Sequence, residues 1–62
     1  MEHLGFIIKH NFKFALIYDG KYQIPLPGGK KIITTLASLR KAGWKIEPWK
    51  HISEEGLRLL NG

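Results

Sequence analysis

The chain contains no cysteine, and this absence excludes disulfide bonds, thiolate metal ligands and cysteine nucleophiles. Small secreted domains usually depend on disulfides for stability, so we expect a reducing, cytoplasmic location. No stretch approaches the roughly 20 consecutive apolar residues of a bilayer-spanning helix, and the first ten residues lack the basic start of a signal peptide. We therefore expect a soluble protein that makes no contact with a membrane.

Acidic residues are also scarce, because five of them stand against ten lysines and arginines and leave a net charge of +5. Residues 30–50 hold six of the basic residues and only one of the acids. Such a basic block is typical of a surface that binds phosphate groups or an acidic protein, although a solvated lysine face has the same composition.

The length of 62 residues predicts one domain, 1–62. A domain of this size buries only about 60% of the surface that its unfolded chain exposes. The core is therefore small, and folding competes with function for every large aromatic side chain.

Alternation of apolar and polar residues predicts an antiparallel meander in the first half of the chain. The expected strands are "LGFIIK" (4–9), "FKFALIYD" (12–19), "KYQIPL" (21–26) and "KKIIT" (30–34). Asp19 and Gly20 have the composition of a hairpin turn in which both residues take a positive φ. Pro25 has no N–H for a ladder, so the third strand has an open edge or ends there. The last segment also fits the start of a helix, but its β-branched residues favour a strand.

A helix is predicted over 35–42, with Thr34 as its N-cap and Gly43 as its stop. A further short strand is predicted at 44–48. The side chains expected to face the core are Leu36 and Leu39 from this helix and Trp44, Ile46 and Pro48 from this strand.

A second helix is predicted from its N-cap Ser53 to the end of the chain. Ile52 and Leu57 have the spacing of a hydrophobic staple, and Gly56 weakens the helix by roughly 1 kcal/mol relative to alanine. The whole pattern predicts an α+β fold. A small antiparallel β-meander of three to four strands is packed by one helix and followed by a further short strand and a C-terminal helix.

The order of hairpin and helix in "FALIYDGKYQIPLPGG…TLASLRKAG" resembles two families over about half of the chain. One is the group of sheet-plus-helix arm-binding domains of phage integrases, and the other is a small antitoxin domain whose strands precede a helix. These resemblances imply a phage or another mobile element as the source, and neither supplies a site residue.

Residue types that can act in catalysis or bind metals occur in the chain, but their spacing matches no known catalytic or metal-binding motif. The three histidines, at 3, 10 and 51, match no metal-binding motif, and "LPGGKK" (26–31) lacks the glycine spacing of a phosphate-binding loop. No serine or threonine belongs to a recognisable arrangement of a nucleophile, a base and a group that orients the base. We therefore expect no catalytic site, metal site or cofactor, and the chain is not predicted to be an enzyme.

The leading hypothesis is a small basic protein that binds DNA or RNA and regulates without catalysis. Cationic side chains of the middle third would contact phosphates, and a tryptophan would stack on a base. The candidate site residues are Lys30, Lys31, Arg40, Lys41, Lys45, Trp49 and Lys50.

The alternative hypothesis is a protein-interaction module, either a homodimer or an inhibitor or antitoxin of a larger enzyme. Its contacts would come from the strand edge near Pro25 and from Tyr18, Tyr22 and Trp49, since aromatic residues are enriched at interface hot spots.

The two tryptophans have different expected roles. Trp44 and Trp49 are five residues apart, so they would point to opposite faces of a continuous strand. Trp44 shares its face with Ile46 and is assigned to the core. Trp49 follows Pro48 and either covers the start of the last helix or stands exposed beside Lys50.

Overall fold

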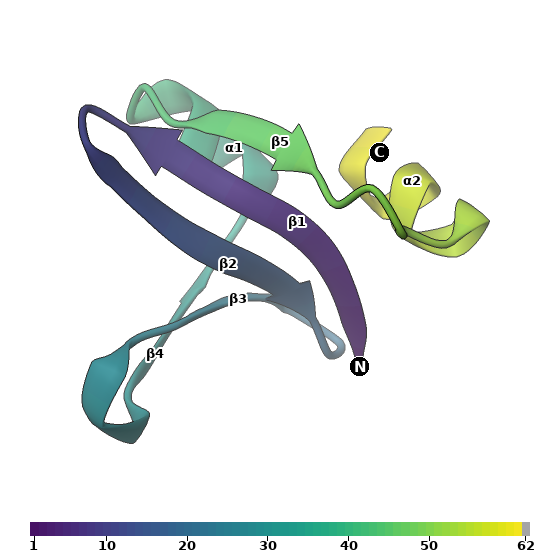
Figure 1. Cartoon of the computed structure of the whole chain (residues 1–62), viewed down its shortest axis with the longest axis horizontal. Helices are drawn as coiled ribbons and strands as arrows, with labels where there is room; N and C mark the ends of the chain where they lie inside the picture. The colour runs from purple at the N-terminus through teal and green to yellow at the C-terminus, as the bar shows by residue number, and fades with distance from the viewer. Residues whose placement is uncertain (62) are drawn as a thin grey trace.

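The computed structural model describes residues 1–61, which form a five-stranded sheet, one short 3-10 turn and two α-helices (Figure 1). The elements are β1 (Glu2–Lys9), β2 (Phe12–Tyr18), β3 (Tyr22–Pro25), η1 (Pro27–Gly29), β4 (Lys31–Thr34), α1 (Leu36–Lys41), β5 (Lys45–Pro48) and α2 (Glu54–Asn61). The predicted α+β fold is confirmed, and residues 31–34 form a strand rather than the start of a helix.

Every neighbouring pair of strands is antiparallel, and the order across the sheet is β4-β3-β2-β1-β5. Short connections join β1, β2, β3 and β4 in chain order, and these four strands form the predicted meander. α1 then connects the edge at β4 with the opposite edge, where β5 pairs with β1. In Figure 1, α1 lies behind β1 and β5, and the C-terminal helix lies beside the end of β5. The strand predicted after the first helix therefore completes the same sheet.

The core lies on one face of the sheet, which we call the helix-covered face. Its buried cluster consists of Leu4, Ile7, Leu16, Ile24, Leu36, Leu39 and Leu60. Burying one such aliphatic side chain contributes about 1.5–3 kcal/mol. Leu36 and Leu39 face the sheet as predicted, and Trp44 packs against the cluster at its periphery. Both helices thus place their leucines on the same face of the sheet.

A β-bulge interrupts β1 near its start. His3 pairs with Ile17 and Gly5 pairs with Leu16, so Leu4 is an additional residue in β1. The side chain of Leu4 is completely buried in the core. Because an extra residue changes the alternation of a strand, the pattern of faces in β1 differs before and after the bulge.

Gly5 allows β5 to approach the backbone of β1 closely. Its φ is +148°, and a Cβ atom at this position would meet the carbonyl oxygen of Glu47 and lie 2.7 Å from the backbone nitrogen of Trp49. A side chain at residue 5 would therefore collide with the backbone of β5, which cannot move without breaking its pairing with β1.

The turn between β2 and β3 differs from the prediction. Tyr18 pairs with Tyr22, so the loop has three residues, 19–21, and only Gly20 takes a positive φ, +73°. The N–H of Asp19 donates to the carbonyl oxygen of Lys21 at 3.0 Å. This bond closes the loop without a positive φ at Asp19.

α1 begins at an N-cap and ends at a glycine stop. The N-cap lies one residue after the predicted position, and the stop lies where it was predicted. The N-cap is Thr35 rather than Thr34, because Thr35 Oγ1 accepts the N–H of Ser38 at 3.1 Å whereas Thr34 still belongs to β4. Gly43, with φ +90°, is the predicted stop, and its N–H donates to the carbonyl oxygen of Arg40 at 3.0 Å.

The start of α2 is partly as predicted. Ser53 Oγ accepts the N–H of Gly56 at 3.0 Å, which confirms the N-cap. The predicted staple is wrong, because Leu57 is 41% exposed and Ile52 packs over Gly56 instead. A Cβ atom at Gly56 would lie 2.6 Å from Ile52 Cγ1, so the glycine makes room for this contact.

Pro48 was predicted to point into the core but is exposed. It is the last residue of the edge strand β5 and lies opposite Gly5, which has no side chain to cover it.

Replacing Gly5 by alanine is expected to lower the free energy of unfolding by about 2–6 kcal/mol, because backbone strain and a steric collision act together. Urea denaturation followed by circular dichroism measures the change. Gly20→Ala is the matched control, since its φ is also positive but its Cβ would meet no atom within 4 Å. The control should lose only about 1–2 kcal/mol. Equal losses in the two variants would contradict the close approach of β5 at Gly5.

Candidate nucleic-acid interface

The second face of the sheet carries no helix in residues 1–61, and we call it the open face. Register and alternation place on it His3, Phe6, Ile8, Lys13, Ala15, Ile17, Gln23, Pro25, Lys31, Ile33, Lys45 and Glu47. Of these residues only Gln23 is buried, and the others are half-buried or exposed. The open face therefore presents apolar, aromatic and basic side chains together.

Four aromatic rings form a continuous row on and beside this face. The ring centroids of Phe6 and His3 are 5.5 Å apart, those of His3 and Trp49 are 4.7 Å apart, and those of Trp49 and His51 are 5.4 Å apart. We call these residues the aromatic row. Their rings meet at angles between 41° and 82°, and Phe6, His3 and Trp49 are half-buried while His51 is exposed.

Backbone contacts hold the aromatic row in place. The N–H of Trp49 donates to the carbonyl oxygen of Leu4 at 3.0 Å, which keeps the chain against β1 after β5 has ended. The bulge at Leu4 puts His3 on the same face as Phe6, because their partners Ile17 and Ala15 alternate regularly in β2. Without the bulge, His3 and Phe6 would point to opposite faces.

Lysines lie along the same part of the open face. Lys13 and Lys45 are the two cross-strand neighbours of Ile8, and Lys13 Nζ lies 4.5 Å from the ring centroid of Phe6. Glu47 is the only acid that register places on this face, and its Oε1 is 3.9 Å from Lys13 Nζ. Both side chains of this pair are about half exposed, so the ion pair is weak. The face keeps a positive balance beside its aromatic rings.

The seven candidate residues from the sequence do not lie on one surface. Lys31 and Lys45 belong to the open face, at opposite edges of the sheet, while Trp49 and its neighbour Lys50 follow β5. Lys30, Arg40 and Lys41 lie outside the open face, the last two in α1. The binding role of these residues stays a prediction.

Arg40 has a structural contact that its position in α1 did not indicate. Its Nη2 donates to the carbonyl oxygen of Leu60 at 3.1 Å. Carbonyl groups in the last turn of a helix have no partner within the helix, and a cation is favourable there. Arg40 therefore joins α1 to the end of α2.

Two tyrosines that the interaction hypothesis uses as exposed contacts instead pack against the core. Tyr18 and Tyr22 are half-buried, and their ring centroids are 4.9 Å apart. The hydroxyl of Tyr22 donates to the carbonyl oxygen of Leu59 at 2.6 Å. Tyr22 and Arg40 thus bind neighbouring carbonyl groups near the end of α2.

Trp49 is neither fully exposed nor one of the residues that pack against the core cluster. Trp49 is half-buried, and its ring lies against those of His3 and His51. Trp44, which was assigned to the core, packs against the core cluster from its periphery, and Trp49 belongs to the aromatic row.

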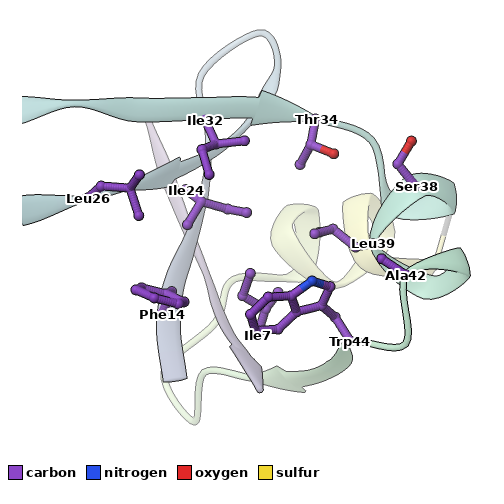
Figure 2. A pocket seen from close by; sticks show the side chains of 10 residues that line it. All are labelled: Ile7, Phe14, Ile24, Leu26, Ile32, Thr34, Ser38, Leu39, Ala42 and Trp44. Carbon is purple, nitrogen blue, oxygen red and sulfur yellow. The ribbon is translucent and has the colours of Figure 1, made fainter. Parts of the chain in front are cut away.

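An apolar cavity of about 370 Å³ opens on the helix-covered face (Figure 2). It forms because β3 pairs with β2 only at residues 17–18 and 22–23, beyond which the β3–β4 hairpin diverges from β2. Its lining residues are Ile7, Phe14, Ile24, Leu26, Ile32, Thr34, Ser38, Leu39, Ala42 and Trp44. None of these side chains is ionisable, so the cavity suits apolar groups rather than acid–base chemistry.

Sequence reasoning missed His3, Phe6 and Lys13 as members of one surface. Lys13 was visible as a polar residue in the alternation of β2. His3 and Phe6 were hidden because a regular strand over "HLGFIIK" puts them on opposite faces. The glycine within this apolar strand was the available signal, since such a glycine often marks a bulge or a close backbone approach.

No family model, no curated protein and no solved structure matches this chain. Across residues 1–61 there is no group of three or more His, Cys, Asp or Glu side chains placed to hold a metal ion. Within the same residues, neither helix has the length and apolar character needed to cross a membrane.

Replacing Arg40 by alanine is expected to lower the free energy of unfolding by about 1–2 kcal/mol, because the carbonyl group of Leu60 loses its charged donor. Thermal and urea denaturation measure the loss. Lys41→Ala removes the next cation of the same helix, which makes no such bond, and should change stability by less than about 0.5 kcal/mol. An Arg40→Ala variant as stable as the Lys41→Ala variant would contradict a structural role.

Proposed function

We propose that this protein binds single-stranded nucleic acid across its open face. Bases would stack on the aromatic row, and phosphates would lie near the lysines beside it. The observation that supports this most is the position of Phe6, His3 and Trp49, whose rings are in contact and half-buried beside Lys13 and Lys45.

A single strand is favoured over a duplex because its bases are free to stack. Aromatic side chains on an open sheet bind unpaired bases in several families of nucleic-acid-binding domains, and each stacked base contributes about 1–3 kcal/mol. A duplex hides these base faces and is read by an element that enters a groove. The aromatic row lies on the sheet and against β1, which suits a strand laid across the face.

The charges fit a phosphate backbone that passes beside the aromatic row. Lys13 and Lys45 lie on strands that flank β1, so their Cα atoms are about 10 Å apart across the sheet. Lys50 follows Trp49 in the chain and is exposed, so it can supply a third cation to the same strand. The ion pair between Lys13 and Glu47 is exposed and long, so a phosphate can replace it at little cost.

The proposal extends to a non-catalytic, regulatory role in the cytoplasm. A protein that covers a single strand can regulate it by keeping other proteins away from it, and this requires no chemical step. The side chains proposed to contact it are aromatic rings and lysines, which bind bases and phosphates without a nucleophile.

We expect single-stranded DNA or RNA to bind with a salt-dependent affinity, measured by fluorescence anisotropy with labelled 12-mers. Contacts from Lys13, Lys45 and Lys50 to three phosphates predict a slope of about −2 for log K against log salt concentration. A duplex of the same length should bind more weakly at each salt concentration. If neither single strand binds at low salt, or if the affinity is indifferent to salt, the proposal fails.

Replacing Trp49 by alanine should lower the affinity for a single strand at least about 5-fold, because one stacked base is lost. Phe12→Ala is the matched control, since Phe12 is 61% exposed but lies on the helix-covered face. The control should bind as the wild type does. Circular dichroism must show that both variants are folded. Equal affinities of the two folded variants would remove Trp49 from the site.

A further inference from the structure

The two edges of the sheet differ in how they are protected. An exposed edge strand presents unpaired N–H and C=O groups, and proteins usually protect it with charges or proline. β5 has Lys45 and Glu47 exposed and ends at Pro48. β4 instead exposes Ile32 by 47% and Ile33 by 54%. Apart from Lys31 at its start, β4 presents no charge at this edge, and its backbone is open to a further strand.

The extended backbone at this edge is longer than β4 itself. Lys30, just before the strand, has φ −81° and ψ 158°, and Thr35, just after it, has φ −124° and ψ 159°. Extended backbone therefore runs from Lys30 to Thr35. Six residues form an edge of the length found in ordinary strands.

The register with β3 shows which backbone groups point outward. The N–H of Leu26 donates to the carbonyl oxygen of Lys30 at 2.7 Å, so Lys30 faces β3. Because inward and outward groups alternate along a strand, Ile32 and Thr34 also face β3. The backbone groups of Lys31, Ile33 and Thr35 point away from the sheet.

We propose that two copies of this chain pair antiparallel through β4, with Ile33 opposite Ile33 of the second copy. The two five-stranded sheets then form one continuous sheet. This inference does not rest on the proposed function, because it uses only the edge of the sheet. It assigns a role to the two most exposed isoleucines, which neither the core nor the aromatic row uses.

Symmetry restricts the possible registers to a few. Two copies paired antiparallel through the same strand are related by a two-fold axis perpendicular to the sheet, so opposite residues share a face. A register centred on Lys31 would set the two Lys31 residues directly opposite each other, which is unfavourable. A register centred on Ile32 would leave them as diagonal neighbours about 7–8 Å apart.

The register centred on Ile33 keeps the positive charges apart. Lys31 then lies opposite Thr35 of the second copy, and the two Lys31 residues are four positions apart along the strand, which is about 13 Å. This separation exceeds the Debye length of about 8 Å at physiological ionic strength. The second copy suits this edge because this register brings no two like charges opposite each other and pairs the exposed Ile33 side chains.

The same register matches backbone donors and acceptors. Each Ile33 donates its N–H to the other Ile33 carbonyl oxygen, and each Thr35 donates its N–H to Lys31 of the second copy. The carbonyl oxygen of Thr35 already accepts the N–H of Leu39 at 3.1 Å, so the Lys31–Thr35 pair forms one bond. On the open face, the row His3, Ile17, Gln23 and Ile33 continues into the same row of the second copy.

Sedimentation equilibrium at concentrations up to about 1 mM tests the pairing, because a small interface gives a weak dimer. We expect the wild type to shift from monomer to dimer across this range. Ile33→Lys places two lysines opposite each other and should weaken dimerisation at least 10-fold. Leu57→Lys changes the same kind of exposed side chain in α2 and should dimerise as the wild type does. A wild type that stays monomeric, or an Ile33→Lys variant that dimerises normally, overturns the proposal.

Cross-linking tests the register, because the chain has no cysteine of its own. Opposite residues in a hydrogen-bonded pair have Cα atoms about 5.5 Å apart, within the range of a disulfide. With an added thiol oxidant, the Ile33→Cys variant should form a covalent dimer. The Lys31→Cys variant should not, since its two thiols are about 13 Å apart at the backbone. Equal cross-linking at both positions, or cross-linking at position 31 alone, overturns the proposed pairing.

Discussion

The approach of β5 to β1 at Gly5 is the constraint on which the rest of the structure depends. A residue without a side chain lets the Glu47 carbonyl group pack against the bulge of β1. The same bulge sends Leu4 into the core and leaves its carbonyl oxygen to accept the N–H of Trp49. One irregular dipeptide therefore completes the core, adds the fifth strand and positions the indole of the aromatic row.

The C-terminal helix is attached to the sheet by side chains rather than by a large apolar surface. Of its leucines only Leu60 is buried in the core. Leu59 packs against the edge of the core, and three hydrogen bonds complete the attachment. Tyr22 and Arg40 bind carbonyl groups near the end of the helix, and Ser53 Oγ at its start donates to Glu2 Oε2 at 3.0 Å. Each of these bonds joins segments at least 20 residues apart in the chain. A small domain with few leucines to bury gains specificity for one arrangement from such directional contacts.

Local rules predicted most of the elements because the signals lie within a few residues. Gly43 and Ser53 work through hydrogen bonds to neighbours three residues away, and these were read from the sequence correctly. Arg40 was predicted to contact a phosphate, yet its guanidinium reaches the end of another helix. The aromatic row was also missed, because it depends on one extra residue in β1 and on a strand 40 residues later in the chain. Gly5 signals an irregularity in the strand, but no propensity or spacing rule identifies the distant strand that packs against it.

The composition of the core explains how a chain this small can leave aromatic side chains on its surface. The completely buried side chains are the aliphatic Leu4, Ile7 and Leu16, and no aromatic ring belongs to the buried cluster. Four of the seven Phe, Tyr and Trp residues border the core, namely Phe14, Tyr18, Tyr22 and Trp44. The other three are Phe6, Phe12 and Trp49. Because the buried cluster consists of leucines and isoleucines, neither Phe6 nor Trp49 is needed in it. The core and the proposed binding surface therefore lie on opposite faces of the same sheet, so the core does not compete with that surface for aromatic side chains.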